Sequence, residues 1–432
     1  MDKYIFLLAA GLCIQLTLNC QPVSFSAGPQ KLIRHSALLP NVEPHIAVNP
    51  NNGNHMVIVT MVYDSAAESD LRTHIAIFAT KDNWRTYKQT DLNLKVGFDP
   101  WVAIKNDSQV VVVALGAFEL TPRTKLLYYT SNDGGMTWPN NPISLGGNHD
   151  HPTMIIDRSR NNRLWLLSST TRRYSQTPPA FAAYLNYSDD WKKFRDSGSI
   201  ILTGPGNSNT LTAAVTSKGK VILPFINFSV KPEEPTTASI KCVTTWDGKN
   251  FSDTLIMAEN SGLRKGFPVL AVDTSWKCRD RRYLLRNSGH GADRSDGLFM
   301  RYSDNDTNWS YDVRVDHNLS SKKYIRTAAM AVNKNGVVGV VWVDRRNDPR
   351  LERNDIYFTI SADHGEWFER EKRITRQSFQ PFTIKNGLAA NRHPAGGDYM
   401  GCVAKPDGSF QIVWADSRAG VFQLYTCNIK VD

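Results

Sequence analysis

A short apolar segment recurs seven times along this chain. Four copies begin with Pro, at residues 44–49, 100–105, 152–157 and 268–273. Three weaker copies lack the Pro, at residues 211–216, 328–333 and 400–405. Equivalent positions are 52 to 72 residues apart, and a period in this range is typical of radial or solenoidal repeat arrays. The spacing therefore predicts a repeat protein.

Each copy is followed by a polar turn and a second apolar run, for example residues 55–62, 110–115, 337–343 and 410–414. A third run carries alternating aromatic residues, as at 298–302 and 356–360. Short β-branched and aromatic runs between Gly, Asn and Asp are typical of strands joined by tight turns. About four strands per repeat predicts an all-β, seven-bladed β-propeller with four-stranded antiparallel blades. A six-bladed ring is the alternative, if residues 211–216 do not begin a blade.

The two ends of the chain are predicted to complete one blade. The last repeat ends after three strands, at residues 422–431. Residues 23–39 precede the first repeat and are free to supply the missing strand. Such closure removes two exposed sheet edges. We expect an N-terminal strand to close the ring.

The chain is predicted to be one exported domain. Residues 1–20 carry Lys3 and then a short apolar segment, which is typical of a secretory signal, and residues 21–432 show no linker. Cys20 is a candidate lipid-attachment site. The formal charge is +10, which favours an acidic partner, whereas basic stripes with interleaved aromatic residues are not visible and nucleic acid is not expected. We expect a monomer that needs no cofactor or catalytic metal; a structural calcium ion is left open.

In a propeller, the starts of the innermost strands meet the ends of the second strands at one end of the axial channel. Polar residues at these positions are the predicted site. The candidate catalytic residues are His45, His149, His151 and Tyr399, because His and Tyr suit proton transfer and nucleophilic roles. The candidate substrate-binding residues are Asp99, Arg172, Tyr174, Arg264, Arg286, His290, Arg326, Arg392, His393 and Asp398. Glu43, Trp101 and Asp150 lie at equivalent strand starts.

Three expectations follow for the electrostatics of this site. Arginines gathered at one pocket would suit a carboxylate or sulfate. Positive charge near Tyr399 would favour its phenolate. Two Asp-Arg pairs, Asp344 with Arg346 and Asp416 with Arg418, recur in successive repeats and more simply form salt bridges between blades.

One further motif carries a family resemblance. Residues 131–138 read Ser-Asn-Asp-Gly-Gly-Met-Thr-Trp, and residues 361–367 hold a copy that is one residue short. An Asp in such a turn bonds nearby backbone N–H groups and Gly supplies a positive φ, so a structural role is expected. With residues 397–401, these motifs resemble the sialidase superfamily of BNR/Asp-box repeat propellers.

The resemblance covers nearly the whole chain after the signal and implies a carbohydrate-active function. Sialidases use an arginine triad and a Tyr nucleophile; Arg264 or Arg286, Arg326 and Tyr399 are the positions that match, while His45 stands where the family has its first arginine. The His-rich set is also similar to propeller α-L-rhamnosidases and to ulvan-lyase-type polysaccharide lyases. The resemblance thus implies a glycoside hydrolase acting on an acidic saccharide. The alternatives are a lyase that performs β-elimination on a uronate polysaccharide, and a glycan-binding propeller without activity.

Overall fold

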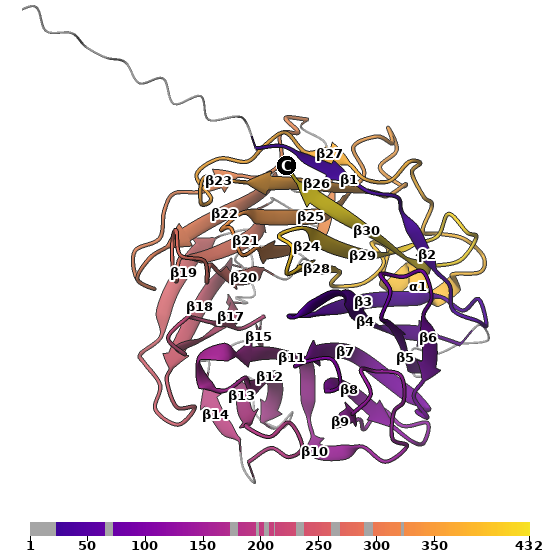
Figure 1. The fold of residues 1–432 in the computed structure, drawn as a ribbon, viewed down its shortest axis with the longest axis horizontal. Helices are drawn as coiled ribbons and strands as arrows, with labels where there is room; N and C mark the ends of the chain where they lie inside the picture. The colour runs from indigo at the N-terminus through magenta and orange to yellow at the C-terminus, as the bar shows by residue number, and fades with distance from the viewer. Residues whose placement is uncertain are drawn as a thin grey trace, which may run out of the picture.

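The computed structural model describes residues 23–432 except 65–71, 173–179, 196–197, 203–206, 211, 230–236, 261–267, 289–296 and 321–323. The predicted signal segment and Cys20 lie outside this part. The described residues form seven antiparallel sheets arranged as a ring around a central axis (Figure 1). The prediction of seven four-stranded blades is confirmed, and the six-bladed alternative is wrong.

We number the blades I to VII in chain order, and each runs from an inner to an outer strand. Blade I contains β3 (Asn41–Asn49), β4 (Asn52–Tyr63), β5 (Thr73–Thr80) and β6 (Lys88–Asp91). Blade II contains β7 (Val96–Ile104), β8 (Val110–Ala117), β9 (Lys125–Ser131) and β10 (Ile143–Gly147). Blade III contains β11 (His149–Asp157), β12 (Arg163–Arg172), β13 (Ala180–Ser188) and β14 (Ser199–Leu202). Blade IV contains β15 (Asn207–Thr210) and β16 (Ala214–Val215), which share one partner strand, then β17 (Val221–Ser229), β18 (Thr237–Thr245) and β19 (Leu255–Asn260).

The remaining blades repeat this order. Blade V contains β20 (Val269–Val272), β21 (Arg282–Ser288), β22 (Gly297–Ser303) and β23 (Val313–Arg314). Blade VI contains β24 (Ile325–Val332), β25 (Val338–Asp344), β26 (Asp355–Ser361) and β27 (Lys372–Arg373). Blade VII contains β28 (Gly401–Ala404), β29 (Phe410–Asp416) and β30 (Gln423–Val431), together with β1 (Phe25–Ala27) and β2 (Lys31–Ile33). The seven recurring apolar segments coincide with the innermost strands, because a strand next to the axis is covered on both faces by neighbouring blades.

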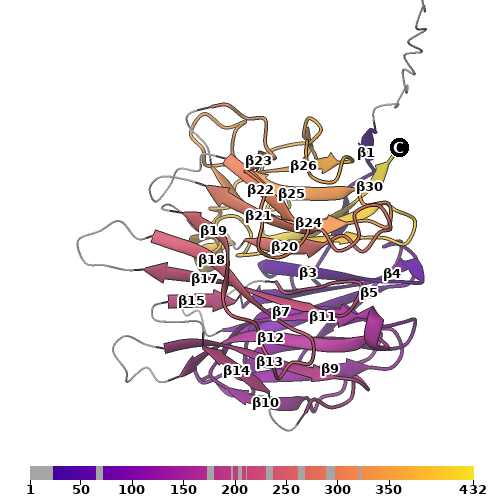
Figure 2. The same cartoon turned by 90° about the vertical axis from the view of Figure 1, so that its left-hand side faces the viewer.

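The N-terminal segment closes the ring, as predicted. Phe25 pairs with Val431 and Lys31 pairs with Thr426, so both β1 and β2 are hydrogen-bonded to β30. Figure 2 shows β1 beside the C-terminal strand at one edge of the ring. Closure uses two short strands rather than one.

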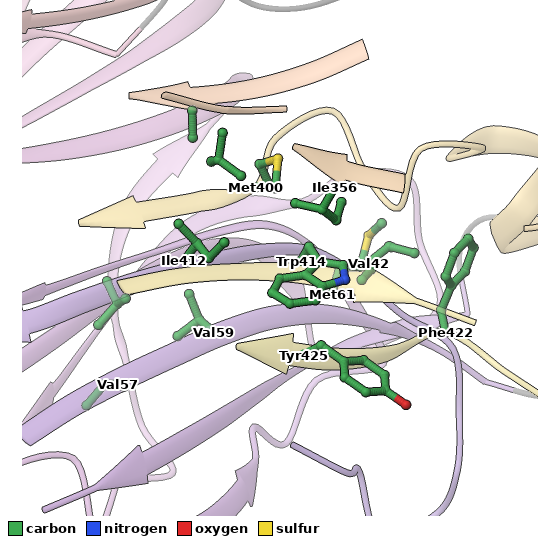
Figure 3. Packing of buried hydrophobic residues seen from close by; sticks show 14 of the residues in the cluster. Val42, Val57, Val59, Met61, Ile356, Met400, Ile412, Trp414, Phe422 and Tyr425 are labelled. Atoms are coloured by element: carbon green, nitrogen blue, oxygen red, sulfur yellow. The ribbon is translucent and has the colours of Figure 1, made fainter. Parts of the chain in front are cut away.

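Apolar side chains fill the space between neighbouring blades. Around the closure, Val42 and Met61 of blade I pack with Ile356 of blade VI and with Trp414 and Phe422 of blade VII (Figure 3). All five side chains are at most 2% exposed. Burial of apolar surface on this scale is the main stabilising term of a ring that has no disulfide among its described cysteines.

The turn at residues 131–138 has the hydrogen bonds expected of it. Asp133 accepts bonds of 2.9 Å from the backbone N–H groups of Met136 and Thr137, and Gly135 has a φ of 89°. The Trp138 indole donates to the carbonyl of Gly135 at 2.9 Å. These bonds lower the pKa of Asp133 to about 2, against the opposing effect of its partial burial. The turn is a folding device.

The two recurring Asp-Arg pairs lie within single blades. Arg346 lies 2.6 Å from Asp344, and the Arg418 Nε donates to Asp416 at 2.9 Å, so each pair belongs to one turn of one blade. The prediction that these pairs form salt bridges between blades is therefore wrong.

Among the described residues the α-helix α1 (Gly387–Arg392) and the short 3₁₀ helix η1 (Arg158–Arg160) are the only helices. None of the described helices is long and apolar enough to cross a membrane.

Candidate active site

One position of the repeat supplies several polar side chains at the same end of the axis. It is the residue immediately before the recurring segment: Glu43, Asp99 and His151 before Pro, and Thr327 before Ala328. All four have positive φ angles, between 40° and 55°, and the pairing of each innermost strand with its neighbour shifts register there. Bulges of this kind redirect a side chain and are common beside active sites. Left-handed backbone in non-Gly residues is strained and concentrates at functional sites.

Tyr399 occupies the corresponding position in blade VII, and two glycines before it allow the approach. A Cβ atom on Gly397, which has a φ of 142°, would lie 2.6 Å from the backbone N of Glu43. The same segment is held from both sides, since Glu43 N–H donates to the Gly396 carbonyl at 2.9 Å and Thr327 Oγ1 donates to the Gly397 carbonyl at 2.8 Å. These contacts hold the segment before Tyr399 between blades I and VI. We call Glu43, Asp99, Asp150, His151, Asp398 and Tyr399 the mouth residues.

A hydrogen bond joins two of the mouth residues directly. The Tyr399 hydroxyl donates to Asp99 Oδ1 at 3.1 Å. Burial, together with the charges of Asp99 and Glu43, raises the pKa of Tyr399 well above its ordinary value. The expected lowering of this pKa by arginine is therefore not found. Tyr399 is a protonated donor whose proton faces a carboxylate.

Asp99 also belongs to a group with Asp150 and His151, whose donor atoms lie within 4.8 Å of one another. Burial raises the pKa of Asp99, although His151 opposes the shift. Burial alone would lower the pKa of His151, but Asp99, Asp150 and Glu43 together raise it to about 10. Burial would raise the pKa of Asp150, but His151 Nδ1 lies 3.1 Å from Asp150 Oδ2. This contact outweighs burial and lowers the pKa of Asp150. At neutral pH His151 is an imidazolium.

Glu43 is the most buried carboxyl group of the mouth, at 3% exposure. Burial and the nearby charges of Asp99 and Asp398 raise its pKa well above the ordinary value. His393, which follows α1 and is itself buried, places Nδ1 3.6 Å from Glu43 Oε1. The Asp398 backbone N–H donates to the same oxygen at 3.4 Å. A buried carboxyl group with a raised pKa is suited to act as a general acid.

His45 lies beside the mouth in a different chemical state. Its ring stacks on Trp101, with centroids 3.6 Å apart, and its Nδ1 accepts a 3.3 Å bond from the Val102 backbone N–H. Burial lowers its pKa to about 3, so the ring is neutral. Trp101 in turn lies edge-on to Tyr399, with centroids 6.2 Å apart. This environment favours a packing role in which His45 and Trp101 support Tyr399.

His149 contacts its own blade. Its Nδ1 forms a 2.8 Å hydrogen bond with Ser168, and its ring lies edge-on to Tyr184 at 4.8 Å. Burial lowers its pKa, so His149 is neutral at neutral pH. As a neutral imidazole it could accept a proton, but its contacts are with its own blade and not with the Tyr399–Asp99 pair.

The predicted arginine cluster is not assembled among the described side chains. Arg286 is 4% exposed and binds Asp312, and Arg326 lies over the Tyr324 ring at 4.9 Å. Arg392 is exposed on the last turn of α1. Tyr174, Arg264 and His290 lie outside the described residues, and the backbone of Arg172 is described in β12 but its side chain is not. The described part of the mouth is consequently acidic.

Sequence reasoning placed Glu43 and Asp150 at strand starts but assigned them no role. The signal that identifies such residues is the position before the repeated Pro, which holds Glu43, Asp99 and His151. A residue before Pro normally has an extended backbone, whereas these three residues have positive φ angles. Strained backbone at three polar residues indicates a functional site. Asp99 as the partner of Tyr399 was also missed, because the two are 300 positions apart in the chain.

Three groups of described side chains have donor atoms close enough to hold a metal ion. They are Glu43, His393 and Asp398; Asp99, Asp150 and His151; and, away from the mouth, His35, His74 and Asp91. The first two groups lie in the mouth, where the same carboxyl groups make the contacts described above.

No family model and no curated protein sequence matches this chain. Solved structures do match. An ulvan lyase, described as a new family of polysaccharide lyase, superposes with a TM-score of 0.55 at 10% identity, over 90% of this chain and 94% of that one. The predicted propeller fold is confirmed.

Two other similar structures are carbohydrate-active enzymes with lower scores. The Hadza microbial sialidase has a TM-score of 0.48 and 16% identity over 72% of this chain and 66% of that one. The α-L-arabinanase of Penicillium chrysogenum, solved with arabinobiose, has a TM-score of 0.46 and 12% identity over 73% and 94%. At 10% identity the likeness to the ulvan lyase shows the fold alone, and a fold does not by itself give a function.

Proposed function

We propose that this protein is a glycoside hydrolase whose reactive pair is Tyr399 and Asp99. The observation that carries the proposal is the 3.1 Å hydrogen bond from the Tyr399 hydroxyl to Asp99, at the end of the axis where the bulged strands meet. As the phenol oxygen attacks an anomeric carbon, its proton passes to Asp99. A Tyr nucleophile is a known exception to the paired-carboxylate scheme of glycosidases.

Glu43 is the general acid in this proposal. The leaving sugar oxygen must receive a proton, and a carboxyl group can supply it only if it stays protonated near the working pH. Burial and two neighbouring carboxylates raise the pKa of Glu43 in that direction. His393 lies 3.6 Å from the same side chain and positions it. The imidazolium of His151 partly balances the negative charge around Asp99.

β-Elimination is the second candidate, and one residue favours it. A lyase needs a neutral base and a positive group that neutralises the uronate. His151 is protonated and the phenolate of Tyr399 is disfavoured, so neither is a ready base. Neutral His149 meets the requirement. The acidic mouth argues against elimination there, because its carboxylates repel a uronate.

The substrate proposal follows from the same charges. A saccharide binds at the mouth, and the net charge of +10 favours one that carries an acidic group. Because the carboxylates near Tyr399 and Asp99 would repel it, the acidic group of the substrate lies away from these two residues. We also propose export, from the apolar segment within residues 1–20, with Cys20 as a candidate anchor and a monomer as the working form.

Incubation with ulvan, arabinan and a sialylated glycoprotein tests the proposal. New reducing ends without ultraviolet absorbance indicate hydrolysis, and absorbing unsaturated products indicate elimination. Hydrolysis that falls at least about 100-fold in both Tyr399→Phe and Asp99→Asn supports the assignment. If the protein binds one of the three substrates but forms products from none of them, the alternative of a glycan-binding propeller is supported.

A further inference from the structure

Three buried polar atoms converge at the contact between blades V and VI, on the opposite end of the blades from the mouth. Asp273 Oδ2, Ser275 Oγ and His364 Nδ1 have no hydrogen-bond partner among the described residues. Asp273 is fully buried and Ser275 is 7% exposed. A Cβ atom on Gly336, which has a φ of 77°, would lie 2.9 Å from Ser275 Oγ, 3.1 Å from Asp273 Oδ2 and 3.5 Å from His364 Nδ1. The three atoms therefore face one small space.

The carboxylate of Asp273 is the costly member of this group. Its other oxygen accepts a 2.7 Å bond from the Ser275 backbone N–H. No Lys or Arg forms an ion pair with it in the described part of the chain. A buried carboxylate without a positive partner is strongly disfavoured, and a bound water would satisfy its hydrogen bonding without neutralising its charge.

The repeat provides two internal comparisons. At the contact between blades III and IV, Asp157, Ser159 and Gly219 occupy the same positions, and Arg160 Nε lies 3.6 Å from Asp157 Oδ2. A cation is thus built into that contact by η1.

At the contact between blades VI and VII the carboxylate is replaced by an amide. Asn333 Nδ2 donates to the Gly408 carbonyl at 2.6 Å, and Gly408 corresponds to Gly336. Here there is no charge to neutralise.

The contact between blades V and VI has neither solution. The residue at the position of Arg160 is Trp276, which is 78% exposed and uncharged. The nearby Arg281 is engaged with Asp304 and with the His364 carbonyl. Among the described residues no side chain supplies a positive charge to Asp273, and an external cation would supply it.

We propose that a divalent metal ion of the zinc class binds between Asp273, Ser275 and His364. The donors are a carboxylate, a hydroxyl and an imidazole nitrogen, and the imidazole favours zinc over calcium or magnesium. Asp273 follows β20 of blade V, while His364 belongs to the turn after β26 of blade VI. The ion therefore joins two blades and stabilises the ring, because it binds only the folded arrangement. This site is independent of the chemistry proposed at the mouth.

Thermal unfolding of the chelator-treated full-length protein tests the site, with ZnCl2 as the probe. Zinc should raise the wild-type Tm by about 3 °C or more at saturation. Asp273→Asn should abolish the rise and should not lower the metal-free Tm, because the new amide can donate to Gly336 as Asn333 does to Gly408. His364→Ala should weaken zinc binding in a titration monitored by calorimetry.

His74→Ala is the matched control, since it removes the other histidine group outside the mouth and should leave the rise intact. Absence of any rise in the wild-type protein would overturn the proposal and leave a solvent-filled contact. A rise that persists in Asp273→Asn would overturn it equally, because the ion would then be bound elsewhere.

Discussion

The Tyr399 hydroxyl of blade VII donates to Asp99 of blade II at 3.1 Å, although blade I lies between these two blades in the ring. The two residues occupy the same position of the repeat in their respective blades. The bond explains how a phenol whose pKa is raised could still act as a nucleophile, because its proton is lost only as attack proceeds. The described charged neighbours of Tyr399 are acidic, whereas arginines were expected there from the sequence.

Glu43→Gln should lower the rate of hydrolysis by about 100-fold or more and remove the alkaline limb of the pH–rate profile. The wild-type limb reflects deprotonation of Glu43, whose raised pKa keeps it an acid above the usual range of carboxyl groups. The profile of kcat/KM for wild type and variant measures this. An alkaline limb that is unchanged in Glu43→Gln would show that another group is the acid.

His151 should stabilise the fold more at pH 6 than at about pH 10. Its pKa is raised from the ordinary 6.5 to about 10, so its contribution to stability is complete below about pH 6.5 and is lost as the pH rises through about 10. Urea unfolding of wild type and His151→Gln at both pH values measures the difference. His149→Gln, on the same strand, is the control. Its pKa is lowered from 6.5, so its contribution should rise slightly as the pH passes through 6.5 and should not be lost near pH 10, which is opposite in sign to the change expected for His151.

His45→Phe should keep activity within about tenfold of wild type, a smaller loss than removal of an acid or base produces. The neutral ring stacks on Trp101 at 3.6 Å, and Phe preserves that contact. His45→Ala should cost more, because Trp101 would lose its support beside Tyr399. Steady-state rates of the two variants decide the question. Equal losses of 100-fold or more in both would restore a catalytic role for His45.

Deletion of residues 1–33 should greatly reduce the stability of the protein. It removes β1 and β2, which pair with β30 and close the ring. Loss of Phe25 also exposes Phe358, whose ring centroid lies 5.5 Å away. Deletion of residues 1–22 leaves both strands and serves as the control. Thermal unfolding of the two shortened proteins should differ clearly, and similar midpoints would contradict the closure as a stabilising element.

Much of the fold could be predicted from the sequence because each blade repeats the same solution. The segment that begins at Pro44 and its equivalents became the innermost strands, and residues 23–39 had no other place than the open blade. Periodicity reports on local structure and on burial, and both recur with every blade.

The electrostatics of the site could not be predicted in the same way. Arg286 occupies the expected strand end, but its side chain binds Asp312 of its own blade. Pairings of this kind depend on side-chain direction, which a period does not encode. The Tyr399–Asp99 bond likewise depends on Gly397, which lets blade VII approach Glu43 closely.

The most direct test is a double-mutant cycle on the rate of hydrolysis with Tyr399→Phe, Asp99→Asn and both together. If the two residues act as one reactive pair, each single variant loses about 100-fold or more and the double variant loses little beyond that. Losses that multiply in the double variant, or a Tyr399→Phe protein with wild-type rates, would contradict the account.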